Sequence, residues 1–131
     1  MKKIYSTIII VSIFLLIVFW SFKNNSAIVK DGTYVLAETE KEPVTSPRVN
    51  ISQEEIFFTY DVLSSYLIVG DYTIERDVLT MRTRDDKYKY VFQVADNKLI
   101  FKADESSEVK LLNNQLGIKI TNNSVFKLVE D

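Results

Sequence analysis

The chain has 131 residues with nearly balanced charge, 16 basic against 18 acidic side chains, and this length is typical of a single domain. It has no histidine and no cysteine, so it cannot by itself form a Ser-His-Asp or Cys-His catalytic centre or a zinc site of the usual ligands. Disulfide bonds and cysteine-linked lipid anchors are excluded too, and we expect a non-enzymatic protein without cofactor or metal.

The first predicted element is an apolar helix at the N-terminus. Residues 4–22 carry no charge, and as a helix they would span roughly 28 Å, about the hydrocarbon thickness of a bilayer. Lys2 and Lys3 precede this segment, so the positive-inside rule places residues 1–3 in the cytoplasm and the remainder outside the cell membrane. Trp20 suits the outer interface. We therefore predict a single-pass transmembrane signal anchor.

A cleaved signal peptide is the alternative for the same segment. Such peptides have a shorter apolar region, of about 7–15 residues, and end at a small-x-small site. The nearest candidate site, Asn25-Ser26-Ala27, begins with an unsuitable residue. An uncleaved anchor is therefore favoured, and in either case the rest of the chain is exported. The long uncharged run after two lysines disfavours a buried helix of a soluble protein.

Short strands are predicted beyond a polar linker at residues 23–30. Residues 31–131 form the predicted extracytoplasmic domain, in which apolar and polar side chains alternate as in half-buried strands. Both prolines lie in the charged loop 40–47. Residues 104–117 have little apolar support and are expected to hold a short strand or one helical turn. The predicted strands are residues 33–38, 48–52, 56–60, 70–75, 78–83, 87–95, 98–103 and 124–130.

The alternation also predicts which side chains face the interior. One face of the middle strands is apolar and the other polar. Seven or eight short strands with almost no helix predict an all-β fold, a small antiparallel meander barrel. The last strand is expected to pair with the first, which removes exposed sheet edges. The predicted inward residues are Tyr72, Ile74, Leu79, Met81, Tyr88, Tyr90, Phe92, Val94, Leu99 and Phe101.

Strand and turn signatures follow one another through the exported part. They read DGTYVL, LSSYL, Gly70-x-Tyr72-x-Ile74, LT, DDKYKYVFQV, LIF, SSEV and VFK. In this order, over about residues 31–128, the chain resembles lipocalin-like (calycin-type) small β-barrel domains of Gram-positive membrane-anchored proteins of unknown function. It is also similar to the exported C-terminal segment of some antibiotic-sensing membrane metallopeptidases.

The resemblance implies a meander barrel of a kind that often binds small apolar molecules at its mouth. The turns at Arg76-Asp77 and at residues 84–87 depart from the small polar residue and glycine expected in tight turns. None of the metallopeptidase's metal-binding helix motif is present, so the resemblance does not imply protease activity.

The aromatic face is the best candidate for a ligand site. Its rings could contact an apolar or sugar ligand while hydroxyls orient it. Alternatively the rings fill the interior of a small barrel, and this is favoured because such a barrel is only wide enough for side chains. Residues 64–66 precede Gly70, where they would form a polar pocket rim or simply bend a strand. The candidate ligand-binding residues are Ser64, Ser65, Tyr66, Tyr60, Tyr72, Tyr90 and Phe101.

Metal and nucleic-acid sites are not expected. Asp85 and Asp86, with Asp61 and Asp71, offer oxygen ligands suited to calcium, but no D-x-D-x-D-G loop is present and aspartate is common in turns. Paired carboxylates could also serve glycoside hydrolysis, yet pairs arise by chance among 18 acidic residues. Without the three lysines of residues 1–23, 13 basic residues face 18 acidic ones, which argues against nucleic acid.

Three classes of function remain. We favour a membrane-tethered extracytoplasmic binding or sensing module, whose partner is a small apolar ligand or a protein of the membrane or cell wall. The alternative is an accessory or immunity-type interaction protein that acts through its outer surface, and an enzyme is the least favoured class. The first predicts an internal cavity near Tyr60, Tyr72, Tyr90 and Phe101. Tight packing of those rings would favour the second.

Overall fold

The computed structural model describes residues 2–23, 26–39, 45–61, 63–113, 115 and 117–130. In these ranges the chain forms one α-helix, α1 (Lys2–Lys23), and two 3-10 helices, η1 (Ala37–Thr39) and η2 (Ala103–Glu105). Residue 1, residues 24–25 of the predicted linker and residues 40–44 of the predicted loop lie outside the description. The strands are β1 (Gly32–Leu36), β2 (Arg48–Ser52), β3 (Glu55–Thr59), β4 (Val69–Glu75), β5 (Val78–Thr83), β6 (Lys89–Ala95), β7 (Lys98–Phe101) and β8 (Val125–Leu128).

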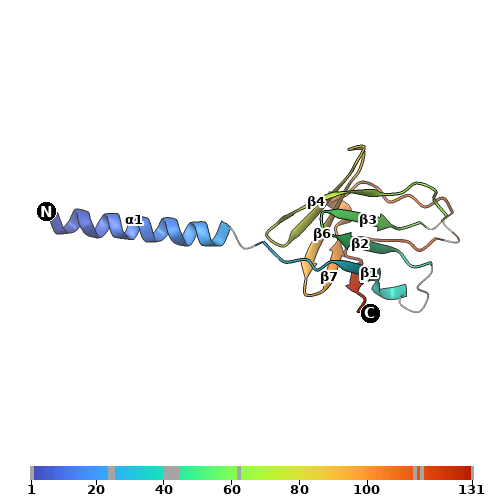
Figure 1. Ribbon diagram of the computed structural model, residues 1–131, viewed down its shortest axis with the longest axis horizontal. Helices are drawn as coiled ribbons and strands as arrows, with labels where there is room; N and C mark the ends of the chain where they lie inside the picture. The colour runs from blue at the N-terminus through green and yellow to red at the C-terminus, as the bar shows by residue number, and fades with distance from the viewer. Residues whose placement is uncertain are drawn as a thin grey trace.

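The eight strands form a closed antiparallel barrel (Figure 1). Each strand pairs with the next along the chain, and β8 pairs back with β1, where Leu128 lies opposite Tyr34. Closure leaves no free sheet edge, which is the physical advantage of an up-and-down barrel. The predicted all-β meander barrel, with its last strand paired to its first, is confirmed.

Aromatic rings fill the barrel interior around Phe58, whose side chain is 1% exposed. Its ring centroid lies 5.1–5.9 Å from five other rings, in edge-to-face or tilted arrangements. Such pairs add stability beyond the burial of apolar area. The interior at this level is therefore a packed core. The five rings are those of Tyr60, Tyr90, Phe92, Phe101 and Phe126.

The predicted inward face is confirmed except at Tyr88. Leu79 and Met81 are fully buried, and Tyr72 is half-buried against the core. The Tyr88 side chain is 41% exposed, and β6 begins at Lys89, two residues later than predicted. The Tyr88 N–H donates to the Thr83 hydroxyl at 3.1 Å, and this side-chain bond turns the chain where the alternation predicted a strand. Our inward prediction for Tyr88 is therefore wrong.

The connection between β7 and β8 holds a short helical turn, η2, and no strand among its described residues. Because β7 is shorter than β6, the first half of β6 bonds to serines after η2. The N–H of Val91 donates to the Ser106 hydroxyl at 2.8 Å, and the N–H of Lys89 donates to the Ser107 hydroxyl at 2.9 Å. Two hydroxyls thus replace a strand partner at this place.

The two ends of the barrel differ. At one end, here called the hairpin end, two-residue turns at Gln53-Glu54, Arg76-Asp77 and Asp96-Asn97 join successive strands. The longer connections gather at the opposite, loop end (Figure 1). The chain enters the barrel at the hairpin end, where the N–H of Ala27 donates to the Arg76 carbonyl at 2.5 Å. The loop end is therefore opposite to the end at which the chain from α1 enters the barrel.

Helix α1 is exposed over Lys2–Ser21, with a mean hydropathy of 2.4. By length and composition it could cross a membrane. A signal sequence near the N-terminus meets the same criteria. The structure thus supports an apolar N-terminal segment of membrane-spanning length.

Candidate functional site

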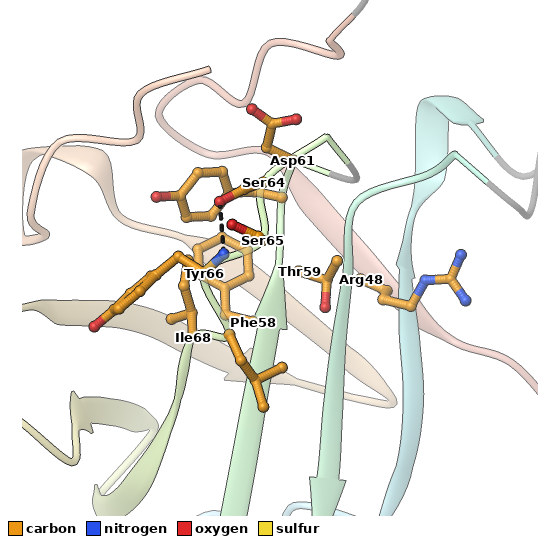
Figure 2. A pocket seen from close by; sticks show the side chains of 10 residues that line it. Arg48, Phe58, Thr59, Asp61, Ser64, Ser65, Tyr66 and Ile68 are labelled. Carbon is orange, nitrogen blue, oxygen red and sulfur yellow. Dashed lines mark hydrogen bonds between the residues drawn. The ribbon is translucent and has the colours of Figure 1, made fainter. Parts of the chain in front are cut away.

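A pocket of about 420 Å³ opens at the loop end, beside the last residues of β3 (Figure 2). Its buried lining residues are Phe58, Asp61 and Ile68, and its exposed lining residues are Ser65, Tyr66 and Leu67. Residues 63–68 are here called the rim loop. This volume lies in the range of small-molecule sites, about 300–1,000 Å³. The pocket is lined by Arg48, Phe58, Thr59, Tyr60, Asp61, Ser64, Ser65, Tyr66, Leu67 and Ile68.

Four of the seven candidate ligand-binding residues line this pocket. Tyr60 follows β3, and Ser64, Ser65 and Tyr66 belong to the rim loop. The Ser64 hydroxyl accepts the N–H of Tyr66 at 3.1 Å, which turns the loop back toward the barrel (Figure 2). The serines therefore both bend the chain and line the pocket wall.

The other three candidates lie elsewhere. Tyr90 and Phe101 are each 1% exposed and belong to the packed core. Tyr72 lies toward the hairpin end, where its hydroxyl donates to the Gln53 carbonyl at 2.7 Å. The structure brings Tyr60, Tyr90 and Phe101 together as rings around Phe58, while the pocket lies at the barrel mouth.

The Asp61 carboxylate joins the two sides of the mouth. The side chain is 7% exposed, and its two oxygens accept the N–H of Leu63 at 3.0 Å and of Leu112 at 2.7 Å. Leu112 comes from the long connection between β7 and β8. Both oxygens are therefore engaged in holding loops. Among the described residues, no group of three or more acidic side chains is placed to bind a metal ion.

Asp61→Asn should lower the free energy of unfolding by about 1–3 kcal/mol, since the amide nitrogen would face one of the two backbone N–H donors in these part-buried hydrogen bonds. Urea denaturation of the full chain in detergent, followed by tyrosine fluorescence, measures this change. The matched control is Asp71→Asn at an exposed position on β4. Equal midpoints for the two variants would show that Asp61 does not hold the mouth together.

A second contact fastens the rim loop to the turn between β5 and β6. The Tyr66 hydroxyl donates to one oxygen of Asp85 at 2.7 Å, and the Thr83 hydroxyl donates to the other at 2.6 Å. The bond from Thr83, then those from Tyr66 and the N–H of Lys87, lower the pKa of the Asp85 carboxyl from 3.8 to about 2. The bond to Asp85 raises the pKa of Tyr66 to about 12. The Tyr66 hydroxyl thus holds the rim loop to the β5–β6 turn through its hydrogen bond to Asp85.

The pKa shifts of Asp85 and Tyr66 define the pH range over which the hydrogen bond between them stabilises the rim loop. Because the pKa of Asp85 is lowered, the stabilisation of the folded state by its carboxylate is complete above pH 3.8 and is lost as pH falls through about 2. The raised pKa of Tyr66 means that its contribution is complete below pH 10.0 and is lost as pH rises through about 12. The hydrogen bond between Tyr66 and Asp85 should therefore hold the rim loop from about pH 4 to 10.

Tyr66→Phe should raise the pKa of Asp85 from about 2 toward 3.8 without reaching it, because the bonds from Thr83 and Lys87 remain. Carboxyl carbon chemical shifts, followed by NMR during acid titration, report this midpoint directly. Tyr88→Phe is the control, since its ring contacts Tyr66 but its hydroxyl does not bond to Asp85 in the structure. An unchanged Asp85 midpoint in Tyr66→Phe would contradict the assignment.

Tyr60 connects the pocket with the core. Its ring lies 5.2 Å from that of Phe58 and 6.2 Å from that of Tyr90, measured between centroids. Burial, followed by a hydrogen bond with Tyr60, raises the pKa of the Tyr90 hydroxyl. A buried tyrosine hydroxyl needs such a partner. Tyr60 therefore offers the pocket chiefly its ring.

The pocket suits an uncharged ligand with an apolar face. Its two charged side chains, Arg48 and Asp61, extend away from the centre (Figure 2). Arg48 donates to the Ser46 carbonyl at 3.4 Å, and the Asp61 oxygens accept backbone N–H groups. What remains toward the opening is aromatic and aliphatic surface with the hydroxyls of Ser65 and Thr59. Such a surface favours contact with an apolar or weakly polar molecule.

Sequence reasoning missed the exposed leucines around the mouth. Leu63, Leu67 and Leu112 have 51%, 63% and 72% of their surface exposed. The run LSSYL does place two of them in one short segment. Leu112 could not be assigned to the same surface, because its backbone N–H bonds to the carboxylate of Asp61, a residue far away in the sequence.

Comparisons with known proteins leave the site to be understood from its own geometry. No protein-family model, no curated protein and no solved structure matches the chain. The likeness to lipocalin-like barrels therefore rests on strand order and barrel closure.

Proposed function

We propose that the protein is a membrane-tethered, extracytoplasmic binding module that takes a small uncharged molecule at the loop end of its barrel. The pocket of about 420 Å³ carries this proposal, because it opens at the end opposite to the entry of the chain from α1. A ligand there would meet apolar surface from Phe58 and Ile68 and hydroxyls from Ser65 and Thr59. No reaction is required of the site, and the lack of histidine and cysteine supports a non-catalytic role.

The cellular setting follows from the N-terminus. Lys2 and Lys3 before an apolar helix favour a cytoplasmic N-terminus and a barrel outside the cell membrane. The closed eight-stranded meander supports placing the barrel with the lipocalin-like domains of anchored Gram-positive proteins. Protease treatment of intact cells tests the orientation. Cleavage at residues 26–131 is expected, and full protection would reject an external barrel.

Native mass spectrometry of the full chain, extracted in detergent from its own membranes, tests the binding function. We expect a species heavier than the bare chain, whose extra mass disappears in Ser65→Trp, because the indole would fill the pocket. Lys87→Trp, at an exposed turn position beyond the pocket, is the matched control. Extra mass that survives in Ser65→Trp would place the ligand elsewhere, and its absence from the unmodified chain would reject a tightly held ligand.

A protein-interaction role is the second candidate, and the packed interior favours it. Rings around Phe58 occupy the space where an internal ligand would lie, and exposed leucines surround the mouth. Exposed apolar groups held on ordered loops are typical of protein contact surfaces. A photo-reactive residue at Leu67 should then crosslink a specific protein in intact cells. The same residue at Thr73, on the outer wall, should not.

A further inference from the structure

The segment that enters the barrel is held firmly against the hairpin end. Ala27 bonds to Arg76, and Val29 packs against the core. The carbonyl of Lys30 accepts the Tyr34 hydroxyl at 2.8 Å, and the Asp31 carboxylate accepts the N–H of Gln53 at 3.0 Å. Residues 27–31, which connect α1 with β1, are therefore held against the hairpin end of the barrel.

The connection from α1 to that end is short. Helix α1 ends at Lys23, and Ala27 is already bonded to the barrel. Four residue steps span at most roughly 14 Å, even when fully extended. A membrane interface beyond the hydrocarbon is about 6 Å deep on each side. If α1 spans the membrane, the hairpin end must lie at or beside the lipid headgroups.

Ile28 is the exposed apolar residue of this segment. Its side chain is 91% exposed although Val29, its neighbour, packs inward. It borders a surface hollow formed with Val94, Ala95 and the turn residue Asp96. An isoleucine so exposed in water would gain free energy by entering the boundary between headgroups and acyl chains. Its position beside the exit toward α1 puts that boundary within reach.

We propose that the hairpin end docks on the bilayer surface, with Ile28 inserted at the interface beside the exit of α1. The inference rests on the proposed anchoring of α1 in the membrane. Docking holds the barrel upright, so that the loop-end pocket and the leucines around it face away from the lipid. The occupant of the pocket would then come from outside the membrane.

The charges of the hairpin end show that apolar contact provides the attraction. The exposed turn and entry residues carry both signs, so anionic lipid offers no clear advantage. We therefore expect docking to be no stronger on anionic than on zwitterionic bilayers. The charged turn and entry residues are Lys30 and Arg76 against Asp31, Glu54, Asp77 and Asp96.

Fluorescence quenching in nanodiscs tests the docking. The chain has no cysteine, so Asp96→Cys at the hairpin end and Lys87→Cys at the loop end each give one labelling site in the full chain. The nanodiscs contain lipids with a nitroxide quencher near the headgroup. We expect a label at residue 96 to lose fluorescence and a label at residue 87 to keep it. Equal quenching at both sites would overturn the docking.

Variants of Ile28 test its part in the contact. On the Asp96→Cys background, Ile28→Glu should reduce quenching of the label, because a carboxylate disfavours the interface. Leu67→Glu, which changes an exposed apolar residue at the loop end, should leave quenching unchanged. Undiminished quenching in Ile28→Glu would overturn the inferred contact.

Trp20 separates failure of docking from failure of anchoring. It is the only tryptophan of the chain and lies near the end of α1. Quenching of its intrinsic fluorescence by the same lipids shows that α1 is inserted. If Trp20 is not quenched, the proposed anchoring itself is rejected. If Trp20 is quenched while residues 96 and 87 respond alike, anchoring stands and only the docking fails.

Discussion

Replacing Phe58 with Ala should lower the free energy of unfolding by about 4 kcal/mol, the size expected for a fully buried phenylalanine. The Phe58 side chain is 1% exposed, and its ring contacts five other aromatic rings. Truncation removes the ring and leaves a cavity that rigid neighbours fill poorly. Urea unfolding of the full chain in detergent, monitored by near-ultraviolet circular dichroism, measures the loss.

Phe57→Ala is the matched control for this prediction. Phe57 is the same residue type on the same strand, but its side chain lies on the outer face and is half-buried. We expect it to cost no more than about 1 kcal/mol, because little packing is lost at a partly exposed position. Similar losses for the two variants would show that the barrel interior does not depend on the ring of Phe58.

Gly70→Ala should lower the free energy of unfolding by about 3 kcal/mol or more, because the strand has no room for a methyl group. Gly70 lies at the start of β4, opposite Ile56 of β3 and Thr83 of β5. A Cβ at this position would overlap the Arg82 carbonyl and lie 2.9 Å from the Thr83 Cα. These are backbone atoms of the neighbouring strand, so β4 and β5 would have to separate. Thermal unfolding of the full chain, followed by far-ultraviolet circular dichroism, measures the effect.

Thr73→Ala provides the comparison, since Thr73 lies on β4 with its side chain exposed. Its melting temperature should stay close to that of the unmodified chain. β4 begins directly after the rim loop, so displacement of β4 at Gly70 should alter the pocket. An unchanged melting temperature in Gly70→Ala would mean that the two strands part easily. The close approach of β4 and β5 would then not matter for stability.

The rim loop, which lines the pocket, is held in place by side-chain hydrogen bonds. Two polar contacts, at Asp61 and at Asp85, hold it over the barrel mouth. Each carboxylate accepts hydrogen bonds on both of its oxygens. Loops held in this way form an ordered surface at low entropic cost to a partner. The proposed binding role and the alternative interaction role both depend on that order.

Sequence patterns predicted the barrel well because strand alternation is a local property. A two-residue period tells which face each side chain occupies, as the buried Leu79 and Met81 show. The prediction failed at Tyr88, because the Thr83 hydroxyl bonds across the turn and delays the strand. The seven candidate ligand-binding residues lie in different places, four at the mouth pocket and three elsewhere in the barrel, for another reason. Inward position is shared by Tyr60, Tyr72 and Tyr90, but depth along the barrel axis cannot be read from alternation.

Composition and periodicity were enough to predict the apolar N-terminal helix, the absence of histidine and cysteine chemistry, and the all-β meander, because these properties depend on a few neighbouring residues. The filling of the interior by rings and the position of the pocket at the mouth became visible in the folded barrel alone. The tertiary structure also placed Leu112 beside the rim loop, through a carboxylate 51 positions earlier in the chain. Such contacts join distant residues whose meeting depends on how the closed barrel brings its loops together.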